Sequence, residues 1–439
     1  MNVLEQYIGK LQIVLAVDLV CEETRVRAAF DKSPLLPLAF LFLPDRFRTN
    51  VSLSELRMTF STTPQVATAD AVIICTEPKS HKTYALWALE IGLPVFMDKP
   101  ITAFAAYDDA GAIQHDFAQI LEASRTSGCR VVISCERRMH YGYKYVEDFL
   151  RSFIGRVRIP ITYVNVHFGG GVWVMPWEFE RLENHPLKYG YGVLLHSGYH
   201  YIDLIARLAE MNCTIKNISL DRPKVKVIAS FPNDIVDAIG EEIYRTLFAD
   251  PKIHRQMNFI DRQGMDKYGE VDISAIGSYK AEGKKCLDFS LQLLSTTVSA
   301  RIDPARASEN MPTNGRMRQE EVLIHLGNFC SIAVHSSPFR GIDGSRRLDD
   351  FNVTIAINPL ISSAQHMYHV DRRALSRIYQ ELPDDAVMNM LASRDLLQSF
   401  LDDNDAPSDI ASHVHSVALL AELFCETRRT YSLADEENG

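Results

Sequence analysis

The sequence predicts an α/β domain with a parallel sheet, followed by an α+β domain with a large, mostly antiparallel sheet. The first part contains short apolar runs rich in β-branched residues, at 71–75, 94–97 and 129–135, with helical patterns between them. Such runs are typical of strands buried on both faces of a parallel sheet. From residue 161 onward, apolar and polar residues alternate, which is typical of antiparallel strands. We expect the domains to span residues 1–136 and 137–439.

Composition and charge indicate which partners to expect and in which state the cysteines are. The chain has 439 residues and a net charge of −10, from 46 basic and 56 acidic residues. Without a Lys/Arg block, we expect no nucleic-acid partner. No apolar run approaches the roughly 20 residues that span a bilayer, so we expect no membrane association. The eight cysteines form no C-x-x-C pair, which favours reduced thiols in a cytoplasmic protein over a zinc site or a disulfide framework.

The first elements point to a nucleotide-binding sheet. Residues 1–10 predict the end of a helix, 11–17 a buried strand ending in Asp18, and 24–30 a second helix. In dinucleotide-binding folds an acid at the end of the second strand receives the ribose hydroxyls. Asp18 is placed for this role, and its charge disfavours a 2′-phosphate. We therefore expect NAD as cofactor, with NADP less favoured.

The glycine-rich turn that opens a Rossmann fold is absent from residues 1–18. That fold begins with a strand and a G-x-G-x-x-G turn, which brings the pyrophosphate to a helix N-terminus. Here Gly9 stands alone. We expect a Rossmann-like sheet without its first strand. Either the sequence is truncated at its N-terminus, or this protein has lost that strand.

Residues 69–100 predict a right-handed strand–helix–strand unit. The helix covers 81–91, between strands 71–75 and 94–97. The loops 76–80 and 98–100 then lie at the carboxyl edge of the sheet, where ligands bind in such folds. Lys99 is thus a cation at the ligand edge, although a solvated loop lysine explains its position equally well. His81, at the start of a helix, is more often a surface histidine.

The remaining chain follows the two-domain pattern. Residues 31–60 contain several prolines and predict little regular structure beyond a short helix at 52–58. Further helices are expected at 104–126, 145–153, 234–248, 388–402 and 409–431, and further strands at 161–168, 224–230, 272–280, 286–298 and 321–334.

His196, His200 and Asp203 have the i, i+4, i+7 spacing of one helix face. Two imidazoles and a carboxylate form either a metal site or a proton-transfer group. A histidine pair satisfied by neighbouring polar groups is the alternative without such chemistry. Trp177 could line a sugar pocket, and core packing is an equal explanation for it.

Several motifs resemble those of the Gfo/Idh/MocA oxidoreductases. ICTEPKSH resembles the family's Thr-Pro-x-x-x-His-like loop, with Glu77-Pro78 where Pro-Asn is commoner. PVFMDKP resembles its Glu-Lys-Pro motif, with Asp98 in place of glutamate. Residues 190–203 resemble its Asp-x-Gly-x-His-x-x-Asp pattern, with His196 replacing the first aspartate. Arg138 matches an Asn-Arg-Arg-like turn, where an interdomain salt bridge is the alternative role.

The resemblance implies an NAD-dependent oxidoreductase that acts on a sugar, polyol or nucleotide-sugar alcohol. It implies His200 as the acid/base and Lys99 as its electrostatic partner, with His196 as a substrate ligand or proton relay. It also implies association into a homo-oligomer. Because no further donor is evident near His196 and His200 and Lys99 is available, we expect proton transfer there and no metal. Taken together, the candidate cofactor contacts are Asp18, Thr76, Glu77, Pro78, His81, Asp98, Lys99 and Arg138, and the candidate substrate contacts are Lys99, Trp177, His196 and His200.

Two other functions stay open. A non-catalytic sugar-binding or regulatory relative would have lost dinucleotide binding, which the missing glycine turn and the altered 76–80 loop favour. A metal-dependent hydrolase would use His196 and His200. The dehydrogenase predicts cofactor binding, the non-catalytic relative predicts sugar binding without cofactor, and the hydrolase predicts inactivation by a chelator.

Overall fold

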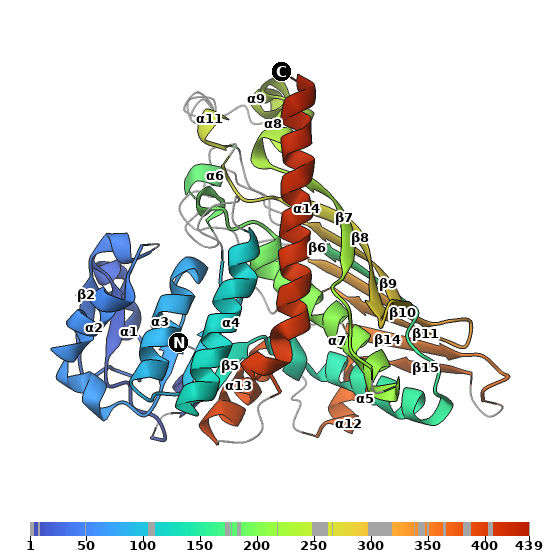
Figure 1. The fold of residues 1–439 in the computed structure, drawn as a ribbon, viewed down its shortest axis with the longest axis horizontal. Coiled ribbons are helices and arrows are strands. Elements are labelled where there is room, and N and C mark those ends of the chain that lie inside the picture. The colour runs from blue at the N-terminus through green and yellow to red at the C-terminus, as the bar shows by residue number, and fades with distance from the viewer. Residues whose placement is uncertain are drawn as a thin grey trace. The chain divides into compact units, whose positions relative to one another are not determined.

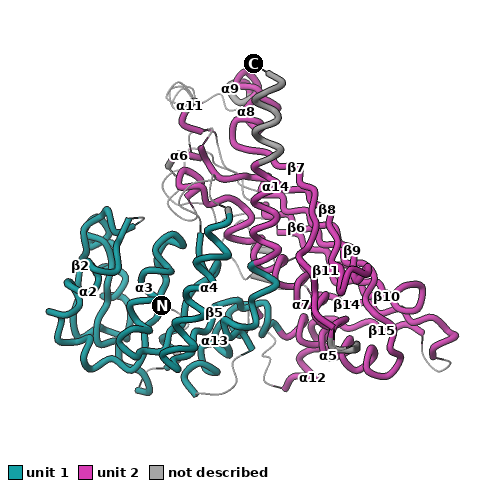
Figure 2. The backbone as a smooth tube through the Cα atoms, in the orientation of Figure 1, with its two compact units in different colours: residues 1–140, 389–417 teal, residues 141–388, 418–439 magenta. Residues whose placement is uncertain are grey.

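The computed structural model describes residues 4–7, 9–48, 50–103, 110–171, 176, 178–181, 186–216, 218–247, 262–265, 267–296, 318–337, 339–340, 347–348, 351–362, 366–380, 388–402 and 407–438. The chain forms two compact units, residues 1–140 with 389–417 and residues 141–388 with 418–439 (Figure 2). The first unit thus extends to His140. It also takes in residues 389–417, which the sequence order assigns to the second domain.

Five parallel strands in the first unit form two separate sheets. Strand β1 (Ala16–Leu19) pairs with β2 (Phe40–Leu43), and β3 (Val72–Ile74), β4 (Val95–Asp98) and β5 (Val131–Ser134) pair in that order. The helices are α1 (Glu23–Phe30), α2 (Leu53–Ser61), α3 (Pro78–Glu90) and α4 (Ala110–Ser127), shown in blue to cyan in Figure 1. This confirms the parallel α/β part of the prediction. Helix α3 begins at Pro78 rather than at His81, because proline suits the first helical turn.

The break between the two sheets falls at a place in the strand order that no described strand fills. A doubly wound sheet has the strand order 3-2-1-4-5-6, and the order β2-β1, β3-β4-β5 fills every place except that of strand 1. Ala16 N donates to Ala39 O and Val72 N to Pro94 O, so the backbone groups of Val17 and Ile73 point to the opposite edges. No described strand pairs with those edges. Val17 and Ile73 are accordingly 37% and 39% exposed.

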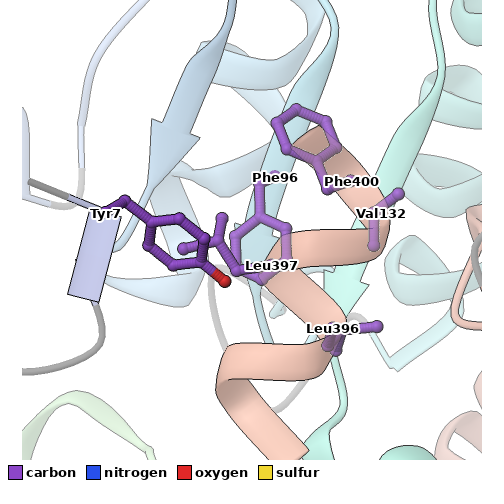
Figure 3. Close-up of a cluster of buried hydrophobic side chains, with 6 residues drawn as sticks. All are labelled: Tyr7, Phe96, Val132, Leu396, Leu397 and Phe400. Carbon is purple, nitrogen blue, oxygen red and sulfur yellow. The ribbon is translucent and has the colours of Figure 1, made fainter. Parts of the chain in front are cut away.

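Helix α13 (Met388–Leu401) explains why residues far along the chain belong to the first unit. Its Leu396, Leu397 and Phe400 are buried with Phe96 of β4 and Val132 of β5, and Tyr7 joins the cluster (Figure 3). The rings of Phe96 and Phe400 lie 5.5 Å apart between centroids. The helix therefore closes one face of the parallel sheet.

The second unit is built on an eight-stranded sheet with the order β15-β14-β11-β10-β6-β9-β8-β7. Adjacent strands are antiparallel except for β6 and β9, which run parallel, so the predicted mostly antiparallel sheet is confirmed. The strands are β6 (Tyr163–Gly169), β7 (Lys224–Ser230), β8 (Asp272–Ala281), β9 (Lys284–Leu294), β10 (Gln319–Leu326), β11 (Cys330–Ser336), β14 (Phe351–Ile357) and β15 (Met367–Val370). A separate short pair is β12 (Phe339–Arg340) with β13 (Arg347–Leu348).

Alternate residues of these strands are buried, as in Val322, Ile324 and Leu326 of β10. Helix α7 (Tyr199–Lys216) contacts β9, and α5 (Tyr141–Val157) contacts β14. The other helices are α6 (Glu178–Arg181), α8 (Pro232–Ile239), α9 (Glu241–Leu247), α11 (Arg262–Met265), α12 (Arg372–Ile378) and α14 (Val414–Asn438). Among the described helices, none has the length and apolar character needed to cross a bilayer.

Candidate functional site

Asp18 lies in β1 near its carboxyl end, and the structure leaves part of its carboxylate accessible. Its Oδ1 accepts a hydrogen bond from Leu19 N at 2.8 Å. Its Oδ2 lies 4.0 Å from Arg25 Nη2, and the side chain is 35% exposed. This is the position from which a carboxylate reaches ribose hydroxyls in a dinucleotide fold.

An ion triad links the carboxyl ends of β1, β2 and β3. Arg48, which follows β2, contacts Glu22 Oε1 through Nη2 and Glu77 Oε1 through Nη1, each at 3.0 Å. Burial disfavours the charged guanidinium, but the bonds to both glutamates raise the pKa of Arg48. The predicted contact residue Glu77 is therefore held by Arg48, and Pro78 next to it opens α3. Neither Glu22 nor Arg48 was expected from the sequence, because β2 went unrecognised.

His81 is completely buried and joins the two loops of the ligand edge. Its Nδ1 lies 2.8 Å from Pro100 O, and its Nε2 lies 3.0 Å from Thr76 O. Burial lowers the pKa of the imidazole, while the Asp98 carboxylate and the two backbone contacts act in the opposite direction. Because a neutral ring has one N–H, it donates to one of the two carbonyls. The structure thus makes His81 a residue that positions both loops.

The lowered pKa of His81 gives the stability of the first unit a definite pH dependence. Below a pH of about 6.5 the unfolded chain binds a proton that the folded chain does not, so stability falls as pH falls toward the lowered folded-state pKa. We expect a slope of at most about 1.4 kcal/mol per pH unit. Urea unfolding across this range should show it. His81→Asn should remove it, and an unchanged slope in that variant would assign the effect to other groups.

Asp98 is the last residue of β4, and Lys99 follows it at the same edge. Asp98 Oδ1 accepts a hydrogen bond from Lys99 N at 2.8 Å, which fixes the start of the loop. Burial raises the pKa of the Glu136 carboxyl, and the charge of Lys99 opposes this increase. The Lys99 ammonium therefore lies within electrostatic reach of a carboxyl group beyond β5. An ammonium so placed can stabilise a developing alkoxide.

Arg138 has a different setting from the one expected of a cofactor contact. Its side chain is buried, and Nη1 donates to Pro407 O at 2.9 Å while Nη2 donates to Ser412 O at 3.1 Å. Nη1 also donates to Ser412 Oγ. These bonds tie the end of β5 to residues 407–412, so they serve the folding of the first unit.

His196 and His200 are not on one α-helix, because His196 lies in a π-helical turn that runs directly into α7. A π-helical turn, Leu194–Gly198, precedes α7, and Gly198 N donates to Val193 O at 2.7 Å. A π-helical turn contains more residues than an α-helical turn, so His196 and His200 do not have the i, i+4 relation predicted for an α-helix. His196 Nδ1 lies 2.9 Å from Ser197 Oγ, whereas His200 and Asp203 are buried on α7. Wide turns of this kind are frequent at functional sites.

Gly192 allows the chain to approach Glu270 closely just before this turn. A Cβ at Gly192 would lie 2.2 Å from Glu270 Oε2. Glu270 is fully buried, and its Oε1 accepts a hydrogen bond from Leu194 N at 2.9 Å. The carboxylate thus caps the turn that carries His196.

Replacing Gly192 by alanine should therefore displace a buried carboxylate. We expect a loss of about 2–4 kcal/mol in the free energy of unfolding, measured by urea denaturation. Gly155→Ala is the matched control, because Gly155 lies in α5 of the same unit and a Cβ there would meet nothing within 4 Å outside its own helix backbone. It should be neutral or stabilising by up to about 1 kcal/mol. Equal stability of the two variants would contradict the close approach.

The described residues fit both ends of a dinucleotide. Asp18 suits the adenosine ribose, and the loops containing Thr76 and Lys99 suit the opposite end. No glycine-rich turn for the pyrophosphate lies among the described residues of β1 to β5. Lys99 belongs to the first unit and His200 to the second, and Trp177 lies outside the described residues. In the part of the chain that is described, no three His, Cys, Asp or Glu side chains are grouped to hold a metal ion.

Comparison with known proteins agrees with this interpretation. Residues 22–122 match the sequence model of an oxidoreductase family with an NAD-binding Rossmann fold. Inositol 2-dehydrogenases from Acidiphilium cryptum and Cereibacter sphaeroides are each 34% identical over 91 residues, 20% of this chain. That match spans 24% and 25% of those relatives, about a quarter of their length.

Two solved structures share the fold over nearly the whole chain. The WlbA dehydrogenase from Bordetella pertussis, in complex with NADH and UDP-GlcNAcA, is 15% identical with a TM-score of 0.54, over 98% of this chain and 91% of that one. An inositol dehydrogenase homologue from Azotobacter vinelandii, complexed with NAD+, is 13% identical with a TM-score of 0.55, over 95% of this chain and 96% of that one.

The parallel sheet of the first unit and the match over residues 22–122 define an NAD-binding Rossmann domain. More narrowly, residues 22–122 match the model of the Gfo/Idh/MocA oxidoreductase family. The resemblance drawn from its motifs is thereby confirmed.

Proposed function

We propose that the protein is an NAD-dependent dehydrogenase that oxidises a secondary alcohol of a sugar, polyol or nucleotide-sugar, or catalyses the reverse reduction. The observation that carries the proposal is Lys99, placed at the carboxyl edge of a sheet whose sequence matches an NAD-binding family. When bound, the nicotinamide ring exchanges the hydride.

The chain's own residues would supply binding and proton transfer. The Asp18 carboxylate would accept hydrogen bonds from the adenosine ribose. The Lys99 ammonium would lower the pKa of the substrate hydroxyl and stabilise the alkoxide. His200 would take the hydroxyl proton, since an imidazole changes charge near neutral pH. His81 would keep the Thr76 and Lys99 loops in register.

A panel assay tests the proposal. The protein is incubated with NAD+ and with myo-inositol, common hexoses and UDP-linked sugar acids in turn, and NADH formation is followed by absorbance. The panel includes UDP-linked sugar acids because the WlbA structure contains UDP-GlcNAcA. It includes myo-inositol because a second structure of the Azotobacter vinelandii homologue contains that compound. Turnover of any panel member supports the proposal, and inactivity with every one despite NADH binding would rule out this substrate class.

A non-catalytic sugar-binding relative is the second candidate. It is favoured by one observation, the altered 76–80 loop, in which Glu77 is held by Arg48 at 3.0 Å. It predicts sugar binding that is unaffected by NADH, which calorimetry with each panel compound would detect.

A further inference from the structure

The Glu22 carboxylate holds two guanidinium groups, and one of them, that of Arg25, also lies near Asp18. Arg25 Nε lies 2.6 Å from Glu22 Oε2, and Arg48 Nη2 lies 3.0 Å from Glu22 Oε1. Arg25 Nη2 is also 4.0 Å from Asp18 Oδ2. Glu22 therefore uses one oxygen for each arginine, at the end of the strand that carries Asp18.

The charged side chains around Glu22 leave little positive potential there. The bond from Arg25 holds the pKa of Glu22 below its usual range; partial burial opposes this effect, and the bond from Arg48 adds to it. Glu22 is thus a carboxylate at neutral pH. The second arm of Arg48 is held by Glu77 at 3.0 Å. Together with Asp18, three carboxylates face two guanidiniums.

This arrangement bears on which dinucleotide the site accepts. NADP differs from NAD by a phosphate on the ribose 2′-oxygen, and proteins usually meet that phosphate with an arginine near the end of the second strand. Arg25 lies 4.0 Å from Asp18, and Arg48 contacts Glu22 from the end of β2, so they are the candidates for this contact. Both are neutralised by Glu22 instead.

We infer that Glu22 is a specificity-determining residue for the cofactor, which favours NAD over NADP by engaging the two guanidiniums that would otherwise meet a 2′-phosphate. The inference rests on the proposed function, because it concerns the same nucleotide site. It assigns to Glu22 a part of the selectivity that the sequence attributes to Asp18 alone.

The test compares the affinities of NADH and NADPH in three variants. Glu22→Gln should shift the affinity ratio toward NADPH by about tenfold, because it removes one negative charge and releases Arg25 and one arm of Arg48. Glu23→Gln is the matched control, since Glu23 lies one residue further and pairs with Arg27 at 2.8 Å. It should leave the ratio within about twofold. Glu22→Gln/Arg25→Gln should lose most of the gain.

Two nucleotide fragments measure the preference for a 2′-phosphate without the rest of the dinucleotide. Adenosine 2′,5′-bisphosphate and AMP differ by the 2′-phosphate and need neither the nicotinamide nor the pyrophosphate loop. Glu22→Gln should favour the bisphosphate by a similar factor. Thermal unfolding of each variant verifies folding, and Glu22→Ser replaces Glu22→Gln if the latter is unfolded.

The binding results distinguish the role of Glu22 from the proposed function. Binding of NADH with an unchanged ratio in folded Glu22 variants would overturn the role of Glu22 and leave the proposed function standing. A shift of equal size in Glu23→Gln would also overturn it, because bulk charge would then be the cause. Failure of every nucleotide and fragment to bind the wild type would overturn the proposed function and this inference with it.

Discussion

Lys99→Met should lower turnover by at least about a hundredfold while leaving NADH affinity nearly unchanged. This result is expected because the ammonium acts on the alkoxide that develops during the reaction, and methionine keeps the length of the side chain without its charge. The backbone of the loop should persist, since Asp98 Oδ1 binds Lys99 N and His81 contacts Pro100 O.

Steady-state kinetics and NADH titration measure the two effects separately. Lys32→Met is the matched control, because Lys32 is an exposed lysine of the same unit, in the turn after α1. It should change neither quantity. Equal losses of stability and NADH binding in Lys99→Met would show that Lys99 has a structural role.

His200→Asn should have the second largest effect. A general base contributes about 10²- to 10⁴-fold to a proton-transfer step, so we expect kcat for alcohol oxidation to fall within that range. Residual activity should rise continuously with pH, because hydroxide replaces the lost base, whereas wild-type activity should level off above the pKa of its base.

His196→Asn provides the comparison for His200. His196 lies in the π-helical turn and contacts Ser197 Oγ, while His200 lies buried on α7. As a substrate ligand or relay, His196 should affect KM more than kcat when replaced. A larger loss of kcat in His196→Asn than in His200→Asn would exchange the two roles. Because His200 is buried, urea unfolding must accompany the kinetics.

The parallel part of the fold could be predicted because its signals are local. Residues 71–75 and 94–97 are short β-branched runs, and the structure places β3 at Val72–Ile74 and β4 at Val95–Asp98. Strand β2 was missed, since FLFL lies among prolines that hide its pattern. As a consequence, the bridge from Arg48 to Glu22 and Glu77 was missed as well.

Other features depend on contacts that no sequence period reveals. The spacing of His196 and His200 assumes 3.6 residues per turn, and the π turn at Leu194–Gly198 breaks that period. Its signal in the sequence was Gly198, where a Cβ would lie 2.7 Å from Val193 O. The packing of Phe400 on Phe96 likewise joins residues far apart in the chain. The order of the helices along the chain does not indicate which of the two units such a helix packs against.

The central claim is that the first unit binds a nicotinamide dinucleotide through its carboxyl edge. Equilibrium binding of NADH and NADPH to the wild-type chain, with Asp18→Ala measured beside it, tests this most directly. We predict saturable NADH binding, weaker NADPH binding, and a marked loss of NADH affinity in Asp18→Ala. Binding of neither nucleotide, or NADH binding that Asp18→Ala leaves unchanged, would contradict the claim.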